Sequence, residues 1–226
     1  MPPIDHIVYA APVRAEDLDA VCHYHELWPE PAKLPLLPAL PLTLAELELL
    51  LQGPVVDLGA IAEVAKRDAG MTAQLLLLAN HNREESDRLY RLEDCLVQIG
   101  ISPLRELVRV MPPVLPSDRQ GRMLLTHSRR TALAAETIAH HVPGVVPEKA
   151  YLAGLLHLLP ELVSLEAGAD WPLPEFASEV IRGFQHPFAV SGEERRLYEV
   201  VLAACEWAGE PELRPTPKCP PRLIGS

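Results

Sequence analysis

The stretch "AGLLHLLPEL" at residues 153–162 decides how this chain folds. It is apolar nearly all the way round, which is typical of a central helix surrounded by other helices. Pro160 should end or kink that helix, because its ring removes an amide donor and clashes with the preceding turn. His157 interrupts the apolar run. This histidine is therefore either a metal ligand or a core side chain that is neutral and hydrogen-bonded.

The segment that precedes this run also has helical spacing. In "MLLTHSRRTALAAETIAHH" at residues 123–141, apolar residues recur at intervals of three and four on the face that carries His127. We expect this face to point inward, with the two terminal histidines ending the helix. The residues predicted to share the face are Leu124, His127, Thr131, Ala134, Ile138 and His141.

Further helices are predicted toward the N-terminus. Thr43 and Glu46 stand in capping-box register, which predicts a helix from about residue 44 to residue 52. The next segment has Asp57 as its N-cap and Gly70 as its stop, and "MTAQLLLLANH" at 71–81 follows as a mostly buried helix. Two more helices, at 91–99 and from Ser102 and Pro103 onward, are separated by Gly100.

The proline-rich segment "MPPVLPSDRQG" at 111–121 predicts a division of the chain into two helical lobes. We place an N-terminal extension at residues 1–33, a first lobe at 34–111, a linker at 112–119, a second lobe at 120–209 and a proline-rich tail at 210–226. Only "HIVYA" at residues 6–10 alternates in a way that suits a strand. The predicted fold class is all-α.

Composition narrows the classes of function. With 31 acidic and 20 basic side chains, the formal charge is -11, which disfavours nucleic acid and anionic membranes as partners. The segment at 57–80 imitates a helix-turn-helix motif, but its second helix offers only Gln74 and Asn80 to read bases, so we interpret it as core. Four dispersed cysteines and the absence of a signal peptide or a membrane span predict free thiols in a cytoplasmic protein.

Five segments in this order resemble the HDOD family. They are "LPLLPALPLTLAELELL", "AEVAKRDAGMTAQLLLLAN", "LEDCLVQIGISPLRELV", "HSRRTALAAETIA" and "KAYLAGLLHLLPEL", and the likeness runs from about Leu34 to about Gly209. HDOD proteins are bacterial output domains related to the HD phosphohydrolase superfamily. The resemblance implies a helical regulatory module of signal transduction that acts through a protein partner and is not an enzyme.

The same resemblance implies that the metal site of the superfamily has been lost. Superfamily members that hydrolyse phosphate esters hold metal with an early histidine, a His-Asp pair and a late aspartate. Here these positions fall on His127, on His157 with Leu158, and on Cys205. Glu206 is a carboxylate next to the last position, but it points from the helix in a different direction. We therefore expect no catalytic residues, no cofactor and no bound metal, with both histidines kept for packing.

Alternatives remain open at this stage. If the Cys205 thiolate faced His127 and His157, the three would give a plausible zinc ligand set, and the chain would be a divergent metal-dependent phosphohydrolase acting on a nucleotide or cyclic dinucleotide. Cys22 and His25 form a second, isolated pair at helical spacing. A third possibility is a structural domain of a larger complex. For the regulatory module, a groove between the two lobes is the expected binding place.

Overall fold

The computed structural model describes residues 36–53, 55–114, 119–163, 172–186, 190, 192 and 194–209. The helices of the first half are α2 (Pro41–Gln52), α3 (Leu58–Ala65), α4 (Ala69–Asn80), the short 3₁₀ helix η1 (Glu85–Asp87), α5 (Leu92–Ile99) and α6 (Ile101–Val110). Those of the second half are α7 (Arg119–Ala139), α8 (Pro147–Leu156), α9 (Leu159–Val163), α10 (Glu175–Gln185) and α11 (Glu194–Ala208). The all-α prediction is confirmed. The possible strand at 6–10, the predicted N-terminal extension and the tail lie outside the described residues.

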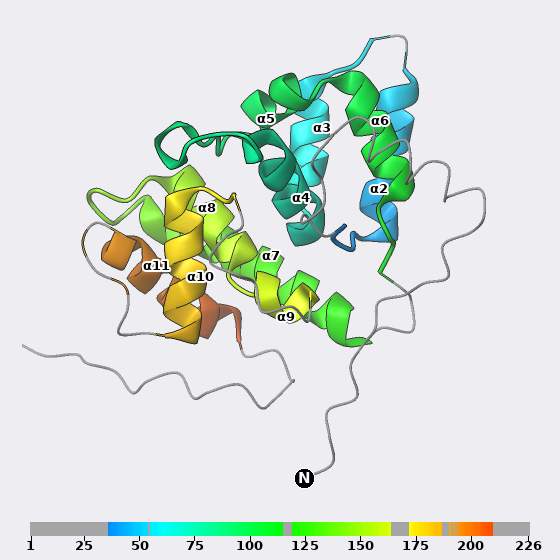
Figure 1. Ribbon diagram of the computed structural model, residues 1–226. Coiled ribbons are helices and arrows are strands. Elements are labelled where there is room, and N and C mark those ends of the chain that lie inside the picture. Colours follow the sequence, from blue (N-terminus) through cyan, green and yellow to red (C-terminus); the bar gives the residue numbers. More distant parts are fainter. Residues whose placement is uncertain are drawn as a thin grey trace, which may run out of the picture.

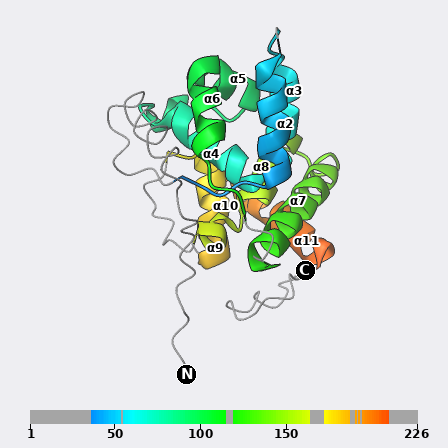
Figure 2. The ribbon, with the colours of Figure 1, turned by 90° about the vertical axis from the view of Figure 1, so that its right-hand side faces the viewer.

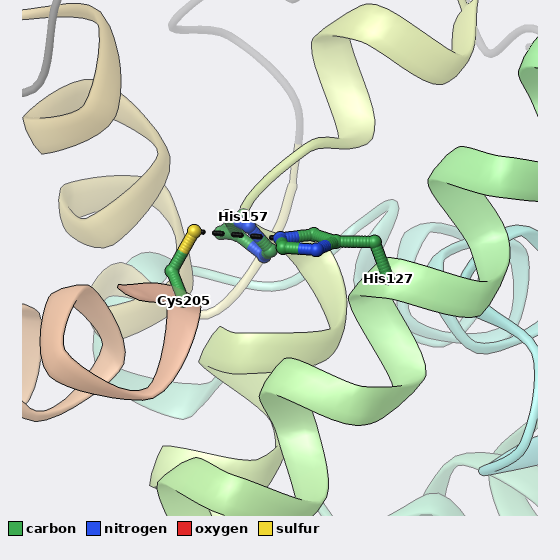
Figure 3. A group of neighbouring side chains, drawn as sticks. All are labelled: His127, His157 and Cys205. Atoms are coloured by element: carbon green, nitrogen blue, oxygen red, sulfur yellow. Dashed lines mark hydrogen bonds between the residues drawn. The ribbon is translucent and has the colours of Figure 1, made fainter. Parts of the chain in front are cut away.

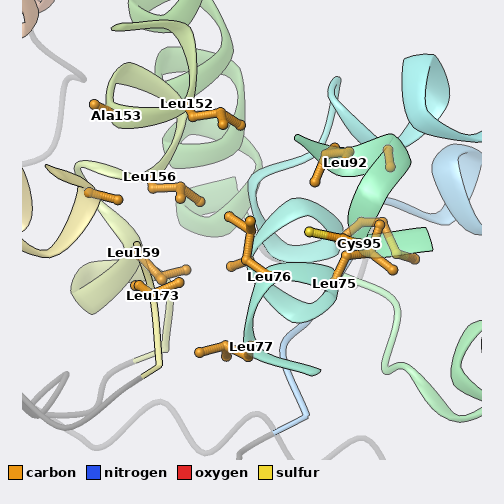
Figure 4. Packing of buried hydrophobic residues seen from close by; sticks show 14 of the residues in the cluster. Leu75, Leu76, Leu77, Leu92, Cys95, Leu152, Ala153, Leu156, Leu159 and Leu173 are labelled. Atoms are coloured by element: carbon orange, nitrogen blue, oxygen red, sulfur yellow. The ribbon is translucent and has the colours of Figure 1, made fainter. Parts of the chain in front are cut away.

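The helices form two groups that share one core. Helices α2 to α6 lie on one side of the molecule and α7 to α11 on the other (Figures 1 and 2). Helix α7 packs against α8 and α11, α10 packs against α8 and α11, and α4 reaches across to α7, α8 and α9. Leucines of α4 lie between Leu92 and Cys95 on one side and Leu156, Leu159 and Leu173 on the other (Figure 4). The hydrophobic core therefore continues across the predicted lobes, whose division at residues 112–119 stays a prediction.

Every residue of α4 is buried, including its polar ones. The Gln74 side chain accepts a hydrogen bond from the Leu37 amide at 2.8 Å. The Asn80 side chain accepts from the Leu89 amide at 2.7 Å and donates to the Leu89 carbonyl at 2.9 Å. Both amide side chains thus bind backbone that has no helical partner, as buried polar groups must. Inside the core they are out of reach of DNA.

Helix α4 begins earlier than the sequence predicted. Its N-cap is Asp68, whose side chain accepts from the Met71 amide at 3.0 Å, and Gly70 lies inside the helix. The prediction that Gly70 stops the preceding helix is wrong, since α3 ends at Ala65. A Cβ atom on Gly70 would lie 1.9 Å from the carbonyl oxygen of Pro38. Glycine is therefore required here by a close backbone approach and not by a helix end.

Helix α2 also starts differently. It begins at Pro41, which suits the first helical turn because its missing amide hydrogen has no partner there. The predicted capping box is wrong: Thr43 lies within the helix, and its side chain hydrogen-bonds to Asp68. The Asp68 carboxylate also accepts from the Leu40 amide at 2.6 Å. Burial raises the pKa of Asp68, although these donors act in the opposite direction. One buried carboxylate thus joins the starts of α2 and α4.

A glycine separates α5 from α6, and backbone hydrogen bonds hold the chain after α6. Gly100, at φ +83°, separates α5 from α6, and α6 begins at Ile101 and not at Ser102. After α6 the chain is tied back to the segment before α2, because the Ala39 amide donates to the Pro112 carbonyl at 3.0 Å and the Val114 amide donates to the Ala39 carbonyl at 2.8 Å. This is an isolated β-bridge.

In the second half of the chain, the apolar segment at residues 153–162 is divided into two helices at His157. Helix α8 ends at Leu156, with His157 as its C-cap, and α9 starts at Leu159 with Pro160 in its first turn. The predicted interruption near Pro160 is present. Along α7, Leu124, Thr131 and Ala134 are buried as predicted, whereas His141 lies beyond the helix end and is exposed, which contradicts its predicted inward orientation.

None of the helices in the described part of the chain is both long enough and apolar enough to cross a bilayer.

We predict that Gly70→Ala destabilises the protein by about 2–4 kcal/mol, because the new methyl group meets a backbone oxygen that cannot move aside cheaply. An alanine inside a helix is ordinarily more favourable than glycine by about 1 kcal/mol, so the expected effect has the opposite sign. Urea unfolding followed by circular dichroism measures the difference. The control is Gly59→Ala in the exposed first turn of α3, for which we expect a change within about 0.5 kcal/mol. Unchanged or increased stability of Gly70→Ala would contradict the described approach of Pro38.

Candidate functional site

Three helices bring together one side chain each. His127 lies on α7, His157 caps the C-terminus of α8, and Cys205 lies in the last two turns of α11. Gly154 permits the close crossing of α8 over α7, since a Cβ atom there would lie 2.9 Å from the Cα atom of Ala132. The crossing places the end of α8 beside the middle of α7, and α11 packs against both helices.

The three side chains point toward one another (Figure 3). His127 Nε2 lies 3.4 Å from Cys205 Sγ, and the ring centroids of the two histidines are 5.4 Å apart. One ligand atom from each residue can be chosen so that all three atoms lie within 4.8 Å of one another. The structure thus brings together the three residues that the alternative zinc hypothesis required.

His157 is fixed by a backbone carbonyl. Its Nδ1 donates to the Gly154 carbonyl at 2.7 Å, which leaves the unprotonated Nε2 as the acceptor. The side chain is buried, and within the described residues no protein group hydrogen-bonds to Nε2. Burial lowers the pKa of His157 to about 3, with a smaller contribution from His127 and an opposing one from the Gly154 carbonyl. His157 is therefore neutral at physiological pH.

His127 has polar contacts with two side chains and with the backbone. Its Nε2 lies 3.2 Å from the Thr131 hydroxyl, in addition to the contact with Cys205, and the ring hydrogen-bonds to the backbone at Gly209. Burial lowers the pKa of His127, the Gly209 contact opposes this, and Arg130 adds to the lowering. Each histidine thus has a backbone partner just after or near the end of a helix. These partners orient the two rings.

The two positions that the family resemblance aligns with carboxylates, Leu158 and Cys205, hold no oxygen ligand. Leu158 packs against a small apolar cluster that includes Leu125 and Leu155. Glu206 is exposed, and among the described residues no carboxylate joins the group of His127, His157 and Cys205. Hard ions such as Mg²⁺ and Mn²⁺ prefer carboxylate and carbonyl oxygen, so this donor set does not fit them. The isolated Cys22–His25 pair lies outside the described residues.

Sequence reasoning missed three groups around the site. Phe184 of α10 packs against His157 with ring centroids 4.8 Å apart. Gly154 and Gly209 contribute through their backbones. The position of Gly154, three residues before His157 on an apolar helix, was the only visible signal, because a small residue often marks a close helix crossing. Contacts made by backbone atoms leave no other pattern in a sequence.

A groove lies where α3 faces α7 and α8, and its lining contains no residue of the proline linker, which was predicted to border the groove between the lobes. Its volume is about 270 Å³, and the Tyr151 hydroxyl donates to the Lys66 carbonyl at 2.7 Å beside it. Lys66 Nζ pairs with Glu63 and Glu93, each at 3.2 Å. Leu133 is half exposed on the α7 side of the groove. Charges of both signs surround this apolar side chain. The lining includes Glu63, Lys66, Arg67, Arg129, Leu133 and Glu136.

The sequence and the fold both have relatives. The family model of the HDOD domain matches residues 37–180. The fold is similar to that of the MmoQ response regulator from Methylococcus capsulatus, at 18% sequence identity and a TM-score of 0.61, over 76% of this chain and 84% of that one. It is also similar to a virulence factor from Campylobacter jejuni, at 15% identity and a TM-score of 0.50, over 86% and 84% of the two chains. No curated protein matches the sequence. At these identities the structural likeness shows the fold alone.

We predict that His127→Ala lowers the free energy of unfolding of the metal-free protein by about 2 kcal/mol, since it removes a buried ring and its hydrogen bonds to Thr131 and Cys205. Urea unfolding in the presence of a chelator is the measurement. His140→Ala, which removes an exposed histidine just beyond the same helix, should change the value by less than about 0.5 kcal/mol. Equal effects of the two substitutions would show that His127 does not contribute to the core as described.

Proposed function

Because this chain belongs to the HDOD family, we propose that it is a non-catalytic regulatory module of signal transduction that acts by contact with a partner protein. The observation that carries the proposal is that Leu158, which is partly buried, packs against an apolar cluster at the position that the resemblance aligns with a metal-binding aspartate. The Methylococcus relative is named a response regulator, and this name supports a signalling role here as well.

The donor set argues against phosphate-ester hydrolysis. A hydrolytic ion needs ligands that offset its charge and an open position for an activated water. Leucine at 158 supplies no ligand and no negative charge, and a carboxylate there would have offset the charge of the ion inside an apolar interior. Among the described residues, no carboxylate joins the three side chains as a further ligand. We derive no hydrolytic step from this site.

The groove between α3 and α7 supports contact with a partner. It combines the half-exposed Leu133 with basic groups from Arg67 and Arg129 and acidic groups from Glu63 and Glu136. An apolar anchor bordered by polar groups is a common arrangement at protein interfaces. We propose that a segment of the partner places an apolar side chain against Leu133 and pairs its charges with the rim.

One observation favours a second candidate function. The convergence of His127, His157 and Cys205 is the geometry that a divergent metal-dependent phosphohydrolase acting on a nucleotide or cyclic dinucleotide would need. Hydrolysis assays separate the two functions. We predict that the protein supplied with Mg²⁺, Mn²⁺ or Zn²⁺ hydrolyses a generic phosphodiester and a cyclic dinucleotide no faster than the double variant His127→Ala/His157→Ala. Metal-dependent turnover that is lost in the single variant His157→Ala would establish the enzyme instead.

A second prediction concerns the groove. Leu133→Glu places a charge in the proposed contact and should reproduce, in the source organism, the change in transcript profile caused by deletion of the gene. Leu49→Glu is the matched control, because Leu49 is an exposed leucine on α2 that does not line the groove. Both variants should keep the wild-type circular dichroism spectrum and unfolding midpoint. A wild-type profile for Leu133→Glu would exclude the groove as the contact.

A further inference from the structure

We infer that His127, His157 and Cys205 form a site for a soft divalent ion, Zn²⁺, and that this site differs in chemistry from the oxygen-rich centre of the hydrolytic superfamily. Two imidazoles and one thiol come from three separate helices and converge within 4.8 Å. Nitrogen and thiolate sulfur are the donors that Zn²⁺ takes in proteins. The inference does not depend on the proposed regulatory role.

The distances already approach those of a zinc site. Tetrahedral zinc with ordinary bond lengths separates a nitrogen and a sulfur ligand by about 3.5 Å. His127 Nε2 and Cys205 Sγ lie 3.4 Å apart. One ligand atom from each residue lies within 4.8 Å of the other two, so a movement of no more than roughly 1.3 Å brings the group to zinc-like separations. A side-chain adjustment at the end of α8 is enough for this movement.

The strongest sign of a ligand is the His157 ring itself. It is 1% exposed, it is aimed at the other two side chains, and no protein group described here hydrogen-bonds to its Nε2. A buried acceptor without a partner costs about 1–3 kcal/mol, so such an atom calls for an explanation. A bound ion would satisfy it. Packing alone would be served equally well by an apolar side chain.

The surroundings of the two rings match those of metal-bound histidines. A ligating histidine ordinarily gives its other ring N–H to a carbonyl or carboxylate, which fixes the ring. His157 Nδ1 donates to the Gly154 carbonyl at 2.7 Å, and the His127 ring hydrogen-bonds to the backbone at Gly209. Our expectation of an empty site rested on the missing carboxylates, and the sequence does not reveal such partners. The structure supplies them through backbone atoms.

Binding of an ion at His127 Nε2 would displace the Thr131 hydroxyl, which lies 3.2 Å away. That hydroxyl has an alternative partner in its own helix. Thr126 and Thr137 on α7 both donate to the carbonyl four residues earlier, each at 2.8 Å. Thr131 can make the same bond, so the displacement leaves no buried hydroxyl without a partner. An ion held by α7, α8 and α11 would fasten the end of α11 to the other two helices.

The full chain, stripped of metal with a chelator and kept reduced, provides the test. Zn²⁺ is titrated in competition with a chromophoric chelator, and Co²⁺ is used as a spectroscopic probe because a thiolate ligand gives it charge-transfer absorption in the near ultraviolet. We expect one ion per chain, a thiolate–cobalt band and a higher unfolding temperature with Zn²⁺. Cys205→Ser should abolish the band and weaken Zn²⁺ binding by at least about 100-fold, since loss of a ligand exceeds the loss of an outer contact.

Controls separate this site from the other thiols. Cys95→Ala removes a buried cysteine of α5, and Cys22→Ser removes the thiol of the isolated Cys22–His25 pair. Both should keep the band and the affinity. Cys205→Asp, which restores an oxygen ligand, should bind Co²⁺ without the charge-transfer band, and this result also guards against a general loss of folding in Cys205→Ser. The inference is overturned if wild-type protein binds no stoichiometric Zn²⁺, or if the thiolate–cobalt band and the Zn²⁺ affinity survive in Cys205→Ser, whichever other thiol then supplies the ligand.

Discussion

The close crossing of α7 and α8 at Gly154 is the constraint on which the site depends. A side chain at this position would meet the backbone of Ala132, so only glycine lets the two helices approach as they do. The same residue offers its carbonyl to His157 Nδ1 and thereby sets the direction of the ring. Helix packing and ring orientation are therefore linked through one residue. The end of α8 at Leu156 then places His157 in the interior beside His127, where α11 closes the group with Cys205.

The first group of helices depends on buried polar side chains that bind backbone. Asp68 joins the start of α4 to the start of α2, Gln74 binds the segment before α2, and Asn80 binds the chain after η1. Each of these hydrogen bonds contributes little to the net free energy of folding. An amide or carboxylate left unpaired in the core would cost more than that, so the bonds mainly disfavour alternative arrangements of the helices. They explain why α4, surrounded by apolar side chains on all sides, has one defined position. That position in turn supports α7, α8 and α9, which α4 contacts directly.

Periodicity was enough to predict the helices, and the order of the segments was enough to identify the family, because both depend on local spacing along the chain. The apolar run singled out His157, helical spacing placed His127 on an inward face, and the family pattern added Cys205. The errors arose where a distant group decides the local structure. Gly70 looks like a helix stop, but it lies within α4 because the Pro38 carbonyl approaches it. Thr43 looks like a cap, but Pro41 starts the helix and Thr43 turns to Asp68. The contacts made by the Gly154 carbonyl and the Gly209 backbone likewise involve atoms that every residue has. A pattern of side chains in the sequence could therefore not predict these contacts.

Leu158 and Cys205, the two positions that the family resemblance aligns with metal-binding carboxylates, affect metal binding jointly. Leucine at 158 alone would leave two imidazoles with no anionic partner, and such a pair would hold a dication poorly. Cysteine at 205 changes this balance in the proposed site, because a metal-bound thiolate would supply both a strong ligand and a negative charge, and its Sγ lies 3.4 Å from His127 Nε2. If these positions correspond as the family resemblance implies, leucine and cysteine replace hard oxygen donors by a soft set that suits the proposed zinc ion. The proposed regulatory function needs no chemistry from this ion, because an ion shared by α7, α8 and α11 would stiffen the half of the molecule that forms one wall of the groove.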